Sequence, residues 1–248
     1  FAERQLATLG ELEVETLPGV RLGHRHVPVA AVGSYVPGGR YPMLASAFMT
    51  VVVPKVAGVE RVVACAPPRD GAGIAPAMLH SMATSGADQI VCIGGVQALA
   101  AMAFGVSELK PVAMIVGAGN AYVAEAKRQL FGTVGIDLLA GPTEILVLAD
   151  ETADPELVAA DLLGQAEHGP TSPAVLVTTS PELGVAVRRD VERLLAHWPT
   201  RAVAGEAWRA RGEIVLAADR AEALEIANRY AHEHVEVHAD EDELDAYL

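Results

Sequence analysis

The alternation of short apolar runs with longer helical patterns is the feature that most constrains the fold of this sequence. The apolar runs are continuous stretches rich in Val, Ile and Leu, as expected for strands whose two faces are both covered. Strands separated by helices form βαβ units, and such units build parallel sheets. We therefore predict an α/β protein, with strands at residues 61–65, 89–93, 112–116, 145–149, 174–178, 213–217 and 235–237.

The segments between these strands have the periodicity of helices. Asp154 followed by Pro155 is a typical helix start, because Asp caps the first turn and Pro fits the first helical position. A change in composition near Gly141 indicates a domain boundary, since the chain is rich in Gly and Ala before it and more charged after it. The predicted helices lie at 75–84, 96–103, 120–131, 154–167, 181–197 and 221–231.

The charge balance excludes one class of partner. The 248 residues include 18 Lys and Arg against 32 Asp and Glu, which gives a formal charge of −14. Nucleic-acid-binding proteins neutralise phosphates with Lys and Arg, and this chain has no basic stretch. The N-terminus lacks an initiator Met and has the pattern of a helix interior, so we expect the chain to be part of a longer one.

Two further features bear on the compartment. No charge falls between Asp88 and Glu108, a length close to that of a membrane span, but several Gly residues divide this run into a strand, a turn and a helix. Cys65 and Cys92 lie inside apolar runs, which predicts buried thiols of a reducing compartment. With no signal peptide at the N-terminus, we expect a cytoplasmic protein with no membrane partner.

Three Gly-rich turns are candidates for ligand binding: Gly38-Gly39, Gly94-Gly95 and Gly117-Ala118-Gly119-Asn120. The last two follow predicted strands and open predicted helices, where backbone N–H groups favour an anion such as pyrophosphate. The Gly117-Ala118-Gly119-Asn120 turn lacks the third Gly of the dinucleotide fingerprint. Such a Gly-rich sequence is equally typical of tight structural turns.

Three polar segments are candidates for catalysis or metal binding. Gln165 and His168 share one helix face and can hold a metal, or His168 can interact with the helix dipole. Glu233 and His234, between a helix and a strand, can supply a base and a proton shuttle; a His232/His234 metal pair and a solvated strand edge are the alternatives. The Gly141-Pro142-Thr143-Glu144 turn can bind a polar substrate or serve as a structural turn.

Together these segments resemble the histidinol dehydrogenase family. They occur in the family's order across nearly the whole chain, and Glu233-His234 matches its catalytic pair. The matching stretches are 32–39, 55–59, 94–98, 117–120, 135–137, 141–144 and 161–170.

The resemblance implies two Rossmann-like parallel-sheet units, one inserted in the other. Residues 34–142 would form an NAD-binding domain. Residues 1–33 and 143–248 would form a second, incomplete domain that carries the metal-binding and catalytic residues.

The resemblance also implies a zinc- and NAD-dependent enzyme that oxidises an alcohol to a carboxylic acid through an aldehyde, as in the conversion of L-histidinol to L-histidine in histidine biosynthesis. Glu233 would activate water, and His234 would accept the hydroxyl proton. The other matching positions are Tyr35, Gln97 and Asn120 for NAD, Gln165 and His168 for zinc, and Thr143, Gln165, His168 and Glu233 for the substrate.

Several departures from the family pattern bear on the substrate. Ser34, Ala118, Thr143 and His232 stand where the family usually has Leu, Pro, Ser and Pro, as in a paralogue such as the sulfopropanediol dehydrogenases. The family's remaining zinc ligands, an Asp and a His, lie further along its chain, and the His comes from a partner subunit. We therefore expect a homodimer in the full-length form.

Two other hypotheses for the function of this chain remain open. A non-catalytic NAD-binding fragment is the main alternative, because only part of the zinc shell lies in this chain. A metal-dependent hydrolase that uses the His-rich segment ranks last, because it has no role for the Gly-rich turns.

Overall fold

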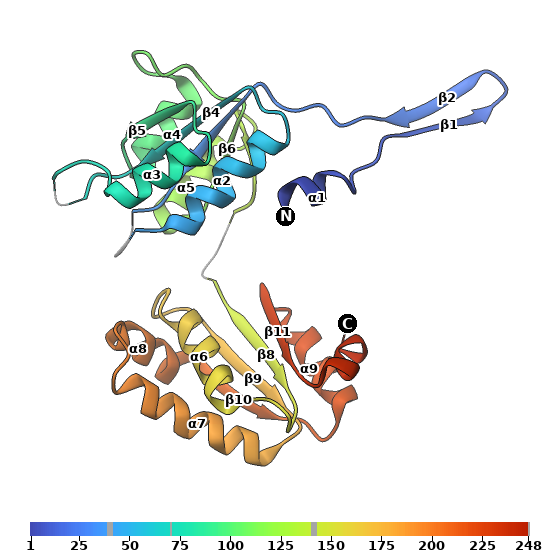
Figure 1. Cartoon of the computed structure of the whole chain (residues 1–248), viewed down its shortest axis with the longest axis vertical. Coiled ribbons are helices and arrows are strands. Elements are labelled where there is room, and N and C mark those ends of the chain that lie inside the picture. The colour runs from blue at the N-terminus through green and yellow to red at the C-terminus, as the bar shows by residue number, and fades with distance from the viewer. Residues whose placement is uncertain (39–41, 70, 140–142, 248) are drawn as a thin grey trace. The chain divides into compact units, whose positions relative to one another are not determined.

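The computed structural model describes every residue except 39–41, 70, 140–142 and 248, and at 241 and 243 it describes the backbone alone. The chain divides into two compact units, Phe1–Gly141 and Pro142–Leu248 (Figure 1). Each unit is built around its own parallel sheet. None of the helices in the described part of the chain combines the length and the apolar character needed to cross a bilayer.

The first unit contains a five-stranded sheet in the order β5-β4-β3-β6-β7. All four neighbouring pairs are parallel. The first strand of this sheet along the chain, β3, therefore lies in its interior, flanked by β4 and β6. The bounds are β3 (Ala31–Tyr35), β4 (Arg61–Ala66), β5 (Gln89–Cys92), β6 (Met114–Val116) and β7 (Gly135–Ile136).

Helices cover both faces of this sheet, which explains its continuous apolar strands. Successive residues of β3 face opposite sides of the sheet, so the strand enters two cores: Val32 belongs to a core with Val51 and Met78 on one face, and Tyr35 belongs to a core with Leu99 on the other. The first core holds α2 (Leu44–Val56) and α3 (Pro76–Thr84), and the second holds α4 (Gly95–Phe104) and α5 (Ala121–Leu130).

The second unit contains a four-stranded parallel sheet in the order β10-β9-β8-β11. Its first strand, β8, again lies in the interior. Leu162 and Val187 belong to a core on one sheet face, and Leu146 and Ala223 belong to a core on the other. The strands are β8 (Ile145–Ala149), β9 (Ala174–Thr178), β10 (Gly212–Leu216) and β11 (His234–His238); the helices are α6 (Pro155–Ala166), α7 (Pro181–Leu195), α8 (Arg201–Arg211), α9 (Arg220–Tyr230) and the 3-10 helix η1 (Glu241–Ala246).

The N-terminal segment consists of α1 (Ala2–Leu6) and an antiparallel hairpin of β1 (Leu12–Leu17) and β2 (Val20–His24). Every residue of the two hairpin strands is exposed. Contacts group this segment with the first unit, and its predicted membership of the second domain stays a prediction. Strand β3 starts at Ala31, slightly before the predicted domain start at residue 34.

The predicted α/β class with Rossmann-like parallel sheets is confirmed, and every predicted strand is present. Strands β3 and β7, the hairpin, and helices α2 and α8 were not predicted. Gly33 and Ser34 interrupt the apolar pattern of β3, and Pro54 lies inside α2, where it gives the sequence the appearance of a helix end.

The two cysteines differ in their surroundings. Cys65 in β4 is buried, as predicted, but the same prediction is wrong for Cys92, which is exposed at the end of the edge strand β5. Burial raises the pKa of the Cys65 thiol to about 12, against a smaller lowering by the backbone N–H of Val36. Cys65 is therefore a protonated, packed side chain at neutral pH.

This difference predicts the thiol reactivity of the folded protein. At pH 8 we expect a disulfide-exchange reagent to modify Cys92 and to spare Cys65, because only about 10⁻⁴ of a thiol with a pKa of about 12 is then ionised. The measurement is thiol release in wild type and in Cys92→Ser, with denatured samples as the control. Rapid reaction of folded Cys92→Ser would contradict the placement of Cys65.

Candidate functional site

The order of the strands in the first unit reverses at one point. From β3 the chain builds β4 and β5 on one side, and it then crosses to build β6 and β7 on the other. Ligands of open α/β sheets bind at the carboxyl ends of the strands at such a switch point. Here that point lies between the end of β3, at Tyr35, and the loop that follows β6.

Gly117 brings the loop after β6 against the end of β3. Its φ angle is +116°, and a Cβ at this position would lie 2.2 Å from the carbonyl oxygen of Tyr35. Any other residue would therefore clash with backbone and adopt an unfavourable conformation. The glycine thus lets the backbone of this loop lie directly against the end of β3.

A buried ion pair holds this loop. The Nζ of Lys127, whose side chain is 3% exposed, pairs with the Asp137 carboxylate and donates to the carbonyl of Gly117 at 2.8 Å. The other oxygen of Asp137 accepts the N–H of Gly117, also at 2.8 Å. Both backbone polar groups of Gly117 are thus used, which fixes the loop's path. The sequence pattern gave no sign of this role for Lys127, because a Lys in an amphipathic helix has the pattern of a surface residue.

The three residues predicted to contact NAD end a strand of this sheet or lie at the start of the helix that follows one. Tyr35 ends β3, and its hydroxyl accepts the N–H of Gly95 at the start of α4 at 3.1 Å. Gln97 is exposed in the first turn of the same helix. Asn120 caps α5, and its Oδ1 accepts the N–H groups of Tyr122 and Val123, each at 3.1 Å.

The environment of these groups suits an anion. Burial raises the pKa of Tyr35, against a smaller lowering by Gly95, so its hydroxyl remains protonated at neutral pH. The N-termini of α4 and α5 also carry the positive end of the helix dipole, which favours an anion. Gly39, the end of the first Gly-rich turn, lies outside the described residues.

The second unit brings together four of the five metal-binding, substrate-binding and catalytic side chains that were predicted in it. The Nε2 of Gln165, in the last turn of α6, donates to the Oγ1 of Thr143 at 2.6 Å. The same Oγ1 lies 3.5 Å from the Nδ1 of His234, and the Oε2 of Glu233 lies 3.8 Å from that nitrogen. Parallel pairing of β8 with β11, with Ile145 opposite His234, produces this arrangement.

His234 has a defined orientation. Its Nδ1 lies 3.2 Å from the carbonyl oxygen of Glu144, which can only accept a hydrogen bond. Nδ1 therefore carries the hydrogen in the neutral ring, and Nε2 carries the free electron pair. The side chains of Glu233 and His234 are 49% and 53% exposed, so water and a substrate can reach both.

His168, the fifth side chain, follows the end of α6. Its backbone N–H donates to the carbonyl of Gln165 at 3.1 Å, which keeps the two residues at the same helix end. In the described part of the chain, its exposed imidazole has no protein partner. The negative end of the α6 dipole favours a cation here. Because Gln165 donates through nitrogen, its carbonyl oxygen stays available as a ligand.

The alternatives for the His-rich segment can be compared with this geometry. His232 precedes β11, and its ring lies edge-on to Tyr230 at 5.3 Å between centroids. Among the described residues, the group of three potential metal ligands contains His238 but neither His232 nor His234. Gly141 and Pro142, from the turn before Thr143, lie outside the described residues.

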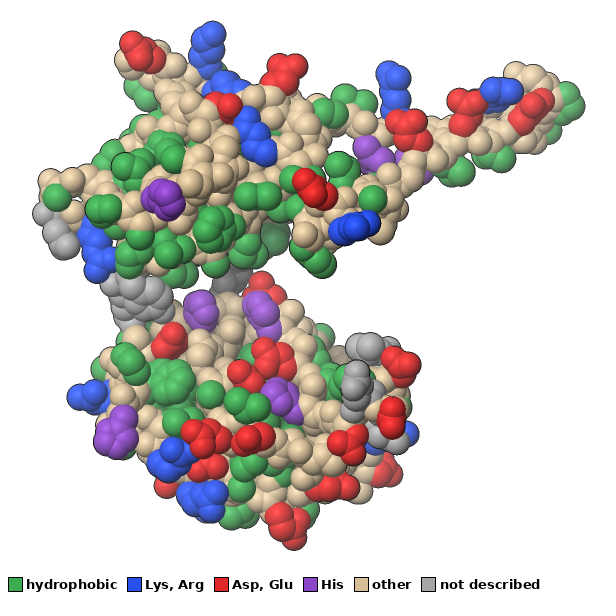
Figure 2. Space-filling view, viewed as in Figure 1, with side chains coloured by type: hydrophobic (Ala, Val, Ile, Leu, Met, Phe, Trp, Pro, Cys, Tyr) green, Lys and Arg blue, Asp and Glu red, His purple; other side chains and the backbone are tan. Residues whose placement is uncertain are grey.

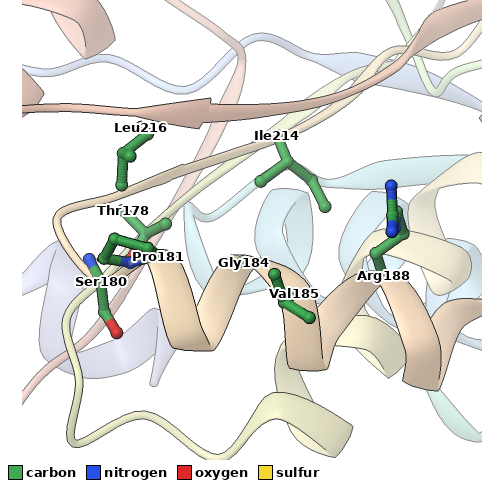
Figure 3. A pocket seen from close by; sticks show the side chains of 8 residues that line it. All are labelled: Thr178, Ser180, Pro181, Gly184, Val185, Arg188, Ile214 and Leu216. Carbon is green, nitrogen blue, oxygen red and sulfur yellow. The ribbon is translucent and has the colours of Figure 1, made fainter.

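An apolar pocket of about 320 Å³ lies elsewhere in the second unit, between α7 and strands β9 and β10 (Figure 3). Strand β10 is the edge of the sheet opposite β11, so this pocket is separate from Thr143 and His234. It contains none of the predicted site residues. Its lining is Thr178, Ser180, Pro181, Gly184, Val185, Arg188, Ile214 and Leu216.

Comparison with known proteins gives consistent matches. The histidinol dehydrogenase family model matches residues 1–247. A histidinol dehydrogenase homolog of Mesorhizobium japonicum is 58% identical over 96% of this chain and 47% of its own length, and the sulfopropanediol 3-dehydrogenase of Ruegeria pomeroyi is 51% identical over 97% and 56%. The crystal structure of histidinol dehydrogenase from Elizabethkingia anophelis matches with a TM-score of 0.91 at 35% identity, over 100% of this chain and 58% of that one. The chain thus spans about half the length of these proteins.

The buried pair of Lys127 and Asp137 predicts a loss of stability on substitution. We expect Lys127→Met to destabilise the protein by roughly 3–5 kcal/mol, because it leaves the Asp137 carboxylate without its cation. The measurement is the urea midpoint, with Arg128→Met as the matched control, since Arg128 on the same helix makes an exposed pair with Glu125. Equal effects of the two substitutions would show that the Lys127 pair has no special role.

Proposed function

The chain belongs to the histidinol dehydrogenase family, and we propose that it forms part of a zinc- and NAD-dependent dehydrogenase that oxidises an alcohol to a carboxylic acid through an aldehyde. The observation that supports this most is the group formed by Thr143, Gln165, Glu233 and His234. It combines an oriented base, an accessible carboxylate and a potential metal ligand within hydrogen-bonding or ion-pair distance.

The first unit supplies a fitting site for NAD. Gly117 lets the loop after β6 lie against Tyr35, and the N-termini of α4 and α5 carry the positive helix-dipole ends that favour an anionic group such as pyrophosphate. Tyr35, Gln97 and Asn120 are the residues proposed to hold the cofactor. NAD, when bound, would accept the two hydrides.

The end of α6 supplies part of a fitting site for zinc. Gln165 and His168 offer a carbonyl oxygen and an imidazole, and zinc accepts both kinds of donor. We propose that the remaining two ligands come from parts of the full-length protein outside these residues, one of them from the second subunit of a homodimer. Zinc, when bound, would polarise the hydroxyl or carbonyl oxygen of the substrate.

His234 acts as the base of the first step. Its Nδ1–H is held by the carbonyl of Glu144, so Nε2 is free to accept the proton of the substrate hydroxyl. A hydride leaves the substrate carbon that bears this hydroxyl, and the alcohol becomes an aldehyde. The Thr143 hydroxyl, between Gln165 and His234, is placed to contact the substrate.

Glu233 acts in the second step. Its accessible carboxylate accepts a proton from a water molecule, whose oxygen adds to the aldehyde carbon. The hydrate formed then loses the second hydride, and the carboxylic acid is released.

Two substrates are candidates for this chemistry, L-histidinol and a sulfonated diol. The 51% identity to a sulfopropanediol 3-dehydrogenase supports the second. Of the positions that depart from the family pattern, Ser34 is no candidate for substrate contact, because its buried hydroxyl lies 2.5 Å from that of Thr50. Thr143 and His232 are the better candidates, since they lie in or beside the catalytic group.

The catalytic pair predicts two different failures. In the full-length protein, Glu233→Gln should still convert alcohol to aldehyde but should fail to oxidise aldehyde. His234→Asn should slow alcohol oxidation by roughly 10²–10⁴-fold, as expected for loss of a general base. NADH formation with alcohol and aldehyde supplied separately distinguishes the steps, and the exposed His197→Asn is the control. Wild-type rates in both variants would remove the pair from the mechanism.

The proposed zinc ligand predicts a change in metal content. His168→Ala in the full-length protein should lower zinc affinity by at least roughly tenfold, because a coordinating donor is lost. The measurement is competition with a chromophoric chelator, and the exposed His80→Ala is the control. Unchanged zinc affinity at the catalytic centre would show that His168 is not a ligand.

A further inference from the structure

A second cluster of potential metal ligands lies in the second unit, apart from the catalytic group. It consists of Asp161 on α6 and of Glu236 and His238 on β11. The His238 Nε2 lies 3.3 Å from the Oδ2 of Asp161 and 3.7 Å from the Oε2 of Glu236. One ligand atom from each of the three residues lies within 4.8 Å of the others.

We propose that this cluster, called the Asp161 triad below, binds a divalent transition-metal ion such as Zn²⁺. Ligand atoms about 2.1 Å from a tetrahedral ion are separated by roughly 3.4 Å. The two distances from His238 are close to that separation. Two carboxylates and one imidazole make three protein ligands, which leaves a fourth position for water.

The charges of the triad also favour a cation. Two carboxylates close together repel each other unless a positive charge lies between them. Among the described ion pairs, both Asp161 and Glu236 pair with His238, and neither pairs with a Lys or Arg. A divalent ion would neutralise both carboxylates. Acidic side chains gather on the face of the second unit drawn in Figure 2, which adds to the attraction.

The backbone holds the three ligands in place. Glu236 and His238 are alternate residues of one strand, so both point to the same side of the sheet. His238 pairs with Ala149, and its carbonyl accepts the N–H of Asp150 at 3.2 Å. Asp161 lies beside the fully buried Leu162 on α6, which fixes that helix against the sheet.

The position in the topology supports the same conclusion. The chain builds β9 and β10 on one side of β8 and then crosses to β11 on the other side, so strand order reverses between β8 and β11. His238 is the last residue of β11, opposite the last residue of β8. His238 of the triad therefore lies at the carboxyl ends of β8 and β11, at the point where the strand order of the second unit reverses. Ligands of α/β sheets bind at such points.

A metal ion here would link α6 to β11. Asp161 precedes Gln165 by one helical turn, and Glu236 follows His234 on the same face of β11. The ion would thus tie the helix that carries the proposed zinc ligands to the strand that carries the catalytic His. The catalytic zinc and the triad's metal would be distinct, since they share no ligand.

Zinc titration of full-length protein tests the proposal. In a His168→Ala background, which weakens the proposed catalytic site, we expect one Zn²⁺ to bind per chain at the triad. Adding His238→Gln or Asp161→Asn should weaken that binding by roughly 100-fold or more, and adding His197→Gln should not. Zn²⁺ should also raise the melting temperature of His168→Ala but not of the His168→Ala/His238→Gln double variant.

The outcomes are distinguishable. Circular dichroism checks that each variant is folded, and Asp161→Asn, which preserves side-chain shape, replaces His238→Gln if the latter is not. Equal Zn²⁺ affinity with and without the triad substitutions would overturn the proposal. If His168→Ala loses the catalytic zinc and keeps the zinc at the triad, the result supports both the proposed catalytic zinc site and the separate site at the triad.

Discussion

Parallel pairing of strands that are buried on both faces is the constraint on which the rest of this structure depends. Parallel neighbours need crossover connections, and the crossover helices cover the sheet. In each of the two parallel sheets, the first strand along the chain ends up inside, at β3 and at β8. Each sheet therefore has one point where strand order reverses. The Gly117 loop lies at the first of these points, and the Asp161 triad lies at the second.

The two units use opposite ends of their helices. In the first unit, the N-termini of α4 and α5 follow strands of the sheet and carry positive helix-dipole ends, which suit the phosphates of a nucleotide. In the second, the C-terminus of α6 holds Gln165 and His168, which suits a cation. The proposed catalytic pair lies at the amino end of β11, and Thr143 joins it there to Gln165 at the end of α6. Helix direction thus supports the proposed placement of an anionic cofactor in the first unit and of a cation in the second.

The candidate site could be predicted only in part from the sequence. Thr143, Gln165, Glu233 and His234 were found because they stand in a recognisable order, and the structure brings them together. Lys127 was missed, since nothing in its local pattern distinguishes a buried cation from an exposed one. The Asp161 triad was missed because Asp161 lies 75 or more positions before Glu236 and His238, and only the folded chain brings α6 beside β11.

The sequence by itself determined the class of the fold, the place of nearly all the buried strands and the order of the family's motifs. These depend on local properties: runs of β-branched and aliphatic residues, helix caps, and Gly at the turns. Only the tertiary structure decided that Cys92 is exposed while Cys65 is buried, and that His238 rather than His232 meets two carboxylates. Burial and contact between distant residues depend on which strand becomes an edge and on register across the sheet, and neither is encoded in any short stretch of the chain.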